Sequence, residues 1–231
     1  MDKNIYCFWK MAKEKNDELV EEIKEFRRKY KNGRHLFNML SSELNNNEFS
    51  SHDELSEFDR ARNFFILNRI SFSGLAISGG FSKESFKKRF TKSSIERLNL
   101  IKGILKDVEI THGDYSNLLD GSQKGVFIYF DPPYLSTKGS KLYGQNGKYH
   151  TNFDHDKFLK AVIKCRHNWL ITYDYTKETK RKFQNFDNIC LVSLKFQYSM
   201  KSVSKDSNPK RREYIITNYK VKKISELRAF K

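Results

Sequence analysis

Residues 126–134 read VFIYFDPPY, an apolar run that ends abruptly in Asp131, Pro132, Pro133 and Tyr134. β-Branched and aromatic residues favour a buried strand, and two consecutive prolines then prevent the hydrogen-bonded ladder from continuing. In open α/β sheets, ligands bind at the carboxyl ends of the strands. We therefore expect a buried strand over 126–130 that carries these four residues to a binding site.

The residues after this strand suit a ligand with an aromatic ring and an amino group. The Asp131 carboxylate can accept a hydrogen bond from an amine, and a proline carbonyl can accept a second one. The ring of Tyr134 offers a flat face for stacking. The alternative is a structural turn in which Tyr134 is merely packed, but the direct passage from strand to Asp-Pro-Pro-Tyr favours the binding role.

The second half of the chain alternates between strand and helix patterns. We expect strands over 108–111, 126–130 and 168–173, helices over 154–165 and 176–183, and an antiparallel hairpin over 189–198 and 213–219. This alternation predicts a doubly wound α/β sheet. In the first half, apolar residues at helical spacing predict one helix capped by Asp17 and ended by Gly33, and another that begins at Asp53. We expect Asp154 to cap its helix, and His155 to belong to that helix start rather than to act as a catalytic base.

The net charge indicates the kind of binding partner, and the cysteine content indicates the redox compartment. The 231 residues include 44 Lys and Arg against 28 Asp and Glu, a formal charge of +16, which indicates a polyanionic partner. A membrane surface is the competing partner, but the sequence has no long apolar run and no signal-peptide pattern, so nucleic acid is favoured. Cys7, Cys165 and Cys190 lack the spacing of a zinc site or a disulfide framework, which indicates a reducing cytoplasm.

Basic residues gather in two places. Between residues 83 and 106, Lys87, Lys88 and Arg89 are adjacent, and acidic residues are few. A solvated helix surface is the alternative, but such surfaces mix the two signs more evenly. The serine- and glycine-rich segment just before, which contains Ser78, adds small groups that can reach phosphates or base edges. A second basic loop contains Lys201.

Several ordered segments resemble the Dam-like family of DNA adenine methyltransferases. The resemblance rests on DPPY at 131–134, FILNRISFSGL at 65–75, SGGFS at 78–82, FTKSSIERL at 90–98, GDY at 113–115 and WLITYD at 169–174. It covers almost the whole chain. It implies a Rossmann-like α/β sheet of an S-adenosylmethionine-dependent methyltransferase with an inserted, mostly helical DNA-recognition region. The implied domains are 1–30, the start of a catalytic domain; 31–106, the insertion; and 107–231, the rest of the catalytic domain.

The resemblance also implies a reaction and a set of residues. The reaction moves a methyl group from S-adenosylmethionine to the 6-amino group of an adenine flipped out of double-stranded DNA, in a restriction-modification or orphan methylation system, and requires no metal. The implied catalytic residues are Asp131, Pro132, Pro133 and Tyr134. The implied cofactor-binding residues are Asp2, Asn4, Asp114 and Tyr115. The implied DNA-binding residues are Arg69, Ser78, Lys87, Lys88, Arg89 and Lys201.

The sequence departs from the family pattern at its front. Members of the family normally begin with a strand and a Phe-x-Gly-x-Gly loop, which is absent here, whereas Asp2 and Asn4 resemble the element that follows that loop. We therefore expect the first strand of the sheet to be missing, or to be supplied by a partner polypeptide. Two functions remain open: a methyltransferase, alone or completed by a partner, and a non-catalytic DNA-binding remnant of one.

Overall fold

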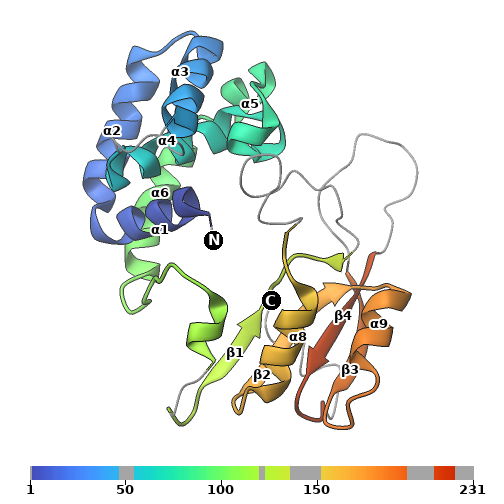
Figure 1. Cartoon of the computed structure of the whole chain (residues 1–231). Helices are drawn as coiled ribbons and strands as arrows, with labels where there is room; N and C mark the ends of the chain where they lie inside the picture. Colours follow the sequence, from blue (N-terminus) through green and yellow to red (C-terminus); the bar gives the residue numbers. More distant parts are fainter. Residues whose placement is uncertain (1, 47–54, 120–122, 136–151, 197–210, 222–231) are drawn as a thin grey trace. The chain divides into compact units, whose positions relative to one another are not determined.

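The computed structural model describes residues 2–46, 55–119, 123–135, 152–196 and 211–221. The chain divides into two units (Figure 1). Each unit has a hydrophobic core of its own. The first, the helical unit, comprises residues up to Asp114. The second, the sheet unit, begins at Tyr115.

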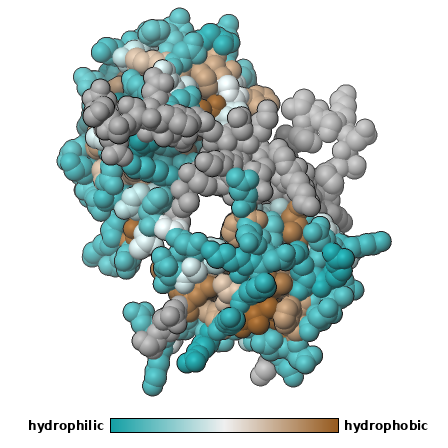
Figure 2. Space-filling model, viewed as in Figure 1, coloured by the Kyte–Doolittle hydropathy of each residue, from teal (hydrophilic) through white to brown (hydrophobic). Residues whose placement is uncertain are grey.

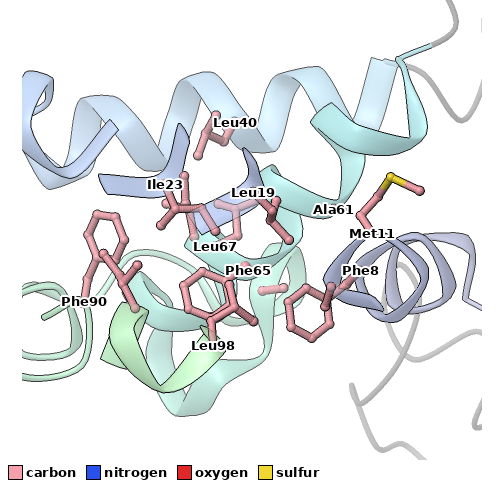
Figure 3. Close-up of a cluster of buried hydrophobic side chains, with 14 of the residues drawn as sticks. Phe8, Met11, Leu19, Ile23, Leu40, Ala61, Phe65, Leu67, Phe90 and Leu98 are labelled. Atoms are coloured by element: carbon pink, nitrogen blue, oxygen red, sulfur yellow. The ribbon is translucent and has the colours of Figure 1, made fainter. Parts of the chain in front are cut away.

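Amphipathic helices build the helical unit. They are α1 (Lys3–Glu14), α2 (Asn16–Lys29), α3 (Gly33–Asn46), α4 (Glu57–Ile70), α5 (Lys83–Lys88) and α6 (Lys92–Ile104), with 3₁₀ turns η1 (Phe72–Gly74) and η2 (Ala76–Gly79). Helix α4 packs against α1, α2, α3 and α5. Leu19 and Ile23 from α2, Leu40 from α3 and Leu67 from α4 are fully buried in the shared core (Figure 3). The predicted helical apolar spacing of this region is thus confirmed.

Side-chain caps determine where several of these helices begin. The Asp2 carboxylate accepts the backbone N–H of Asn4 at 2.8 Å, at the start of α1. Thr91 caps α6 by accepting the N–H of Ser94, whose own hydroxyl accepts the N–H of Thr91 in return. Such caps satisfy backbone donors that have no partner inside the helix, so short polar residues at these positions define the helix ends.

Two predicted boundaries in this region are wrong. Asp17 does not cap a helix: α2 begins at Asn16, and Asp17 lies in its first turn, where it pairs with Lys102 at 2.5 Å. The buried amide of Asn16 instead donates to carbonyls of α1 and α6, which fixes the break between α1 and α2. Gly33 begins α3 rather than ending α2. A Cβ atom at this position would lie 2.6 Å from the Phe86 ring, so a larger residue does not fit there. Packing, not helix termination, requires this glycine.

The sheet unit contains a four-stranded mixed sheet. Its strands are β1 (Phe127–Phe130), β2 (Asn168–Asp174), β3 (Cys190–Phe196) and β4 (Arg211–Thr217), in the order β1-β2-β4-β3. β1 and β2 are parallel, whereas β4 is antiparallel to both β2 and β3. α8 (His155–Lys164) connects β1 to β2, and α9 (Lys177–Phe183) connects β2 to β3 (Figure 1). The predicted α/β fold, the helix capped by Asp154 and the closing hairpin are confirmed.

One face of this sheet carries the core. Side chains alternate between the two faces of a strand, so Trp169, Ile171 and Tyr173 of β2 share a face. They pack with Phe158 of α8 and Phe183 of α9. The alternate residues of the two parallel strands lie on the opposite face: Phe127 and Tyr129 of β1, and Leu170 and Thr172 of β2. Phe127 and Tyr129 are 49% and 58% exposed, so this face of β1 is open to solvent.

The strand predicted over 108–111 is wrong. These residues have no regular secondary structure and pair with no strand among the described residues, and Val108 is 42% exposed. β-Structure requires a hydrogen-bonded neighbour, which an apolar pattern alone does not supply. In the described part of the chain β1 pairs with β2 only, so its other edge has no ladder. Residues 2–30 pack with the other helices of the helical unit, and their assignment to the catalytic domain stays a prediction.

Truncating Leu67 should destabilise the protein far more than truncating Leu100. Leu67 is fully buried, whereas Leu100 is 66% exposed on α6. Leu67→Ala removes buried apolar contacts and leaves a cavity, with an expected loss of about 2–5 kcal/mol in the free energy of unfolding. Leu100→Ala should change it by less than about 0.5 kcal/mol. Urea denaturation followed by circular dichroism measures both, and equal losses would contradict the assigned core.

Candidate active site

The Asp-Pro-Pro-Tyr segment lies at the carboxyl end of β1. The strand ends at Phe130, and Asp131 is exposed directly beyond it. Pro132 is buried and Tyr134 is half-buried, with its ring centroid 6.0 Å from that of Tyr173. The segment therefore presents a carboxylate to solvent beside an aromatic ring that the core supports.

The Asp131 carboxylate has a defined partner on the neighbouring strand. The Thr172 hydroxyl donates to Oδ1 of Asp131 at 3.0 Å. The same hydroxyl oxygen lies 3.1 Å from the Tyr129 hydroxyl. All three side chains lie on the open face of the sheet, where parallel pairing of β1 with β2 brings them together.

A polar pair lies within the aromatic core beneath this site. The Tyr173 hydroxyl forms a hydrogen bond with Nδ1 of His155, the first residue of α8. Burial raises the pKa of Tyr173, and the Asp174 carboxylate raises it further. Burial lowers the pKa of His155 below its usual 6.5, and Lys182 lowers it further. At neutral pH both groups are therefore uncharged, which suits a structural hydrogen bond that supports the ring stack under Tyr134.

The four predicted cofactor residues do not form a single cluster within one unit. Asp2 caps α1. The Asn4 amide oxygen accepts a hydrogen bond of 3.0 Å from the Arg60 guanidinium, and both side chains are buried in the helical unit. Asp114 is exposed, in the same helical unit. Tyr115 belongs to the sheet unit, where its ring packs on Phe158. Because the Asn4 side chain is buried with Arg60, exposed Asp114 is the better placed of these residues to meet a ligand.

Three arginines of the helical unit, Arg69, Arg89 and Arg97, interact electrostatically. Arg69 stacks on the Phe65 ring, and its Nε is buried with no hydrogen-bond partner. Burial lowers the pKa of Arg69, and the positive charges of Arg89 and Arg97 lower it further. In the described part of the chain, no carboxylate forms an ion pair with any of the three. Such a concentration of like charge favours an anionic ligand.

The helical unit also carries exposed basic residues. Lys87 and Lys88 are exposed on α5, where Lys88 pairs with Glu84. Figure 2 shows mostly hydrophilic side chains over the visible surface of the helical unit. Arg69, Lys87, Lys88 and Arg89 all belong to the helical unit, and their role in DNA binding stays a prediction. Lys201 lies outside the described residues.

Residues 71–81 form a compact loop next to the arginine cluster. A backbone bridge between Ser71 and Phe81 closes it, and Ser78 is half-buried in its η2 turn. Ser73 and Ala76 have backbone φ values of 52° and 48°, which residues other than glycine rarely adopt. The Asn68 amide donates to the Gly74 carbonyl at 2.7 Å and supports the turn. Strain held in place in this way often marks a binding loop.

Sequence reasoning missed several residues of these surfaces. Phe72 is 64% exposed at the start of the loop, an unusual position for a large aromatic side chain. The interleaved serines and glycines around it were the available signal. Tyr129 could have been found from strand alternation, since it precedes Asp131 by two residues. Thr172 could not, because only the register of β1 against β2 places it beside Asp131.

The described residues contain no cluster of His, Cys, Asp and Glu side chains that could hold a metal ion. None of their helices has the length and apolar character needed to cross a bilayer.

The chain is similar to curated type II methyltransferases. It matches the type II methyltransferase M.MjaIII of Methanocaldococcus jannaschii with 23% identity over 208 residues, 84% of this chain and 71% of that protein. It matches the type II methyltransferase M1.LlaDCHI of Lactococcus lactis subsp. cremoris with 28% identity over 114 residues, 46% of this chain and 37% of that protein.

The fold and these similarities define a DNA methyltransferase with an α/β sheet. More particularly, residues 1–227 match the D12 class N6 adenine-specific DNA methyltransferases, and the chain belongs to that family. The resemblance inferred from the sequence is thereby confirmed.

The depressed pKa of His155 predicts a loss of stability in mild acid. Because the folded-state pKa is below the unfolded value, the unfolded chain binds a proton more readily. The stabilisation is fully present above about pH 6.5 and is lost as pH falls below that value. His155→Gln should therefore weaken the pH dependence of the urea midpoint between pH 7.5 and 5.5. His35→Gln on α3 is the control, and an unchanged dependence in the His155 variant would contradict the assignment.

Proposed function

We propose that this chain methylates the 6-amino group of adenine in double-stranded DNA, with S-adenosylmethionine as the methyl donor. The observation that carries the proposal is Asp131 at the carboxyl end of β1, followed by two prolines and Tyr134, in a member of an adenine-specific family. A ring that carries an amino group can donate hydrogen bonds to a carboxylate and a carbonyl and can stack on an aromatic face, and all three are present at the carboxyl end of this strand.

The chemistry needs an amine made nucleophilic and held in line. We infer that Asp131 and the Pro132 carbonyl each accept one amino hydrogen of adenine, which favours the pyramidal nitrogen that attacks. S-Adenosylmethionine, when bound, supplies an electrophilic methyl group and takes the electron pair of its breaking sulfur–carbon bond. The methylated nitrogen then loses one proton, which Asp131 is placed to accept. Alignment contributes more than base strength here, because the donor is already activated.

The adenine must leave the double helix to reach this site. Its 6-amino group is paired within the duplex, so the nucleotide has to be flipped out and stacked on an aromatic face. We assign that face to Tyr134, whose ring is supported by Tyr173 and, through the buried hydrogen bond, by His155. His155 thus has a supporting role and no catalytic one.

The cofactor would be held by carboxylates. A ribose or adenine of S-adenosylmethionine presents hydroxyl and amino donors, which suit carboxylates such as those of Asp114, which is exposed, and Asp2. The resemblance also assigns Tyr115 to the cofactor, and its ring packs on Phe158 in the sheet unit. Asn4 would contribute only by giving up its bond to Arg60.

The helical unit would bind the DNA. Arg69, Arg89 and Arg97 supply concentrated positive charge, and Lys87 and Lys88 add exposed ammonium groups. Phosphate contacts of this kind position a protein on DNA, and the loop that carries Phe72 and Ser78 would meet base edges or sugars. Since both relatives are type II methyltransferases, we place the activity in a restriction-modification or orphan methylation system.

The open edge of β1 is suited to receive a further strand. The edge of β1 away from β2 has no partner among the described residues, and exposed Phe127 and Tyr129 lie beside it. Open edges with apolar neighbours favour addition of a strand. We propose that a strand carrying the glycine loop pairs here. Methyl transfer by the chain alone would contradict the need for a separate polypeptide.

Loss of the Asp131 carboxylate should abolish methylation without abolishing DNA binding. Asp131→Ala removes an acceptor that acts on the amine and not on phosphate, so methyl transfer should fall by at least about 100-fold. The assay measures tritium from labelled S-adenosylmethionine in unmethylated plasmid DNA, and mass spectrometry identifies N6-methyladenine. Asp187→Ala, at another exposed position of the sheet unit, is the control. Transfer at the parental rate by the Asp131 variant would refute the proposed role.

Neutralising α5 should reduce the salt dependence of DNA binding. Lys87→Ala, Lys88→Ala and Arg89→Ala together should lower the slope of log K against log salt by about 2–3, if each residue contacts one phosphate. Fluorescence anisotropy with a labelled duplex measures the slope. The matched control replaces Lys177, Lys180 and Arg181, three exposed basic residues of α9. Equal slopes in the parental chain and the α5 variant would show that α5 is only a solvated surface.

The second candidate function is a DNA-binding remnant without catalysis. The open edge of β1 favours it, because the resemblance implies a cofactor-binding strand that pairs with no strand of the described part of the chain. Salt-dependent DNA binding without methyl transfer, and without S-adenosylmethionine binding in calorimetry, would identify this function. Transfer that Asp131→Ala abolishes would exclude it.

A further inference from the structure

Two hydroxyl groups, of Thr172 and Tyr129, form a chain of hydrogen bonds with the candidate catalytic carboxylate on the open face of the sheet. Thr172 Oγ1 lies 3.0 Å from Asp131 Oδ1 and 3.1 Å from the Tyr129 hydroxyl. An ionised carboxylate only accepts hydrogen bonds, and a threonine hydroxyl has a single proton to donate. Thr172 must therefore donate to Asp131, and Tyr129 must donate to Thr172. The direction of the chain of hydrogen bonds is thus fixed.

The parallel pairing of two strands creates this arrangement. Tyr129 pairs with Leu170, so Thr172 lies two residues further along the same face, next to the end of β1. Thr172 lies between Ile171 and Tyr173, which are 0% and 1% exposed on the core face. Its backbone is consequently held by the best-packed part of the sheet unit. Asp131, by contrast, lies just beyond the last residue of β1.

We propose that Thr172 is a positioning residue that orients the Asp131 carboxylate for the adenine amine, and that Tyr129 acts through Thr172 by fixing its hydroxyl. This inference rests on the proposed adenine methylation. With Oδ1 held by Thr172, rotation of the carboxylate about its side-chain bonds is restricted, and the second oxygen has one direction in which to accept the amino hydrogen. Groups anchored on strands hold such geometry more closely than groups on loops.

The size of the effect follows from the exposure of these groups. Water can replace the Thr172 hydroxyl as a donor, because the hydrogen bonds lie on the open face of the sheet. A variant without the hydroxyl keeps a solvated carboxylate but loses its orientation. We therefore expect kcat to fall by about 10-fold, with little change in KM for DNA, rather than the complete loss expected on removing Asp131.

The kinetic test compares substitutions that separate the hydroxyl from the volume of the side chain. Thr172→Val removes the hydroxyl and keeps the shape, whereas Thr172→Ser keeps the hydroxyl. On unmethylated plasmid DNA, the valine variant should lose about 10-fold in kcat and the serine variant should keep most of it. Parental kcat in the valine variant, or equal losses in both variants, would overturn the proposal. Tyr175→Phe removes a tyrosine hydroxyl outside this chain of hydrogen bonds and should leave kcat unchanged.

The role of Tyr129 is tested by a double-mutant cycle. Tyr129→Phe alone should lower kcat by less than Thr172→Val does, since Thr172 can still donate to Asp131 with a less ordered hydroxyl. In the Thr172→Val background the same substitution should have no further effect, because its only route to Asp131 is gone. Additive losses would show that Tyr129 acts independently of Thr172. Thermal midpoints of all variants control for loss of folding.

A crystallographic comparison keeps the inference testable if the parental chain transfers no methyl group. In that case the proposed activity of the isolated chain fails, and the positioning role is decided by the Asp131 conformation. The carboxylate should point toward residue 172 in the parental and serine proteins, and should adopt a different or divided conformation in Thr172→Val. An unchanged Asp131 conformation in the valine protein would overturn the inference on structural grounds alone.

Discussion

The parallel pairing of β1 with β2 is the constraint on which the sheet unit depends. It places Ile171 and Tyr173 opposite α8 and α9, and so forms the core. The same register places Thr172 beside Asp131 on the other face. A slip of one residue would exchange the two faces and bury the polar set. Core and candidate site are thus two consequences of a single register.

In the helical unit the main constraint is electrostatic, namely the repulsion between positively charged side chains. Arg69 is partly withdrawn from water beside Arg89 and Arg97, which stabilises neither the folded chain nor the arginines themselves. Its stacking on Phe65 and the packing of α4 hold it there. A bound anion would offset this repulsion, and a DNA backbone is a regular array of anions, which is consistent with the proposed role of the helical unit.

The errors of sequence reasoning share a physical cause. The segment 108–111 has strand-like alternation but no neighbour in the described structure, so the pattern did not produce a strand. Gly33 resembled a helix terminator, yet the Phe86 ring is what excludes a side chain there. In each case a local pattern had two explanations, and a residue distant in sequence decided between them. Where the local signal had one strong meaning, as in the cap at Asp154, the prediction was right.

By itself, the sequence determined the family, the α/β sheet with its closing hairpin, and the choice of Asp131 and Tyr134 as candidate site residues, because these follow from strand propensity, proline geometry and ordered motifs. Tertiary structure alone decided that Thr172 and Tyr129 adjoin Asp131, that Asn4 is engaged by Arg60, and that three arginines converge. The reason is that these are contacts between residues up to 56 positions apart, set by strand register and helix packing. No local pattern encodes such distances.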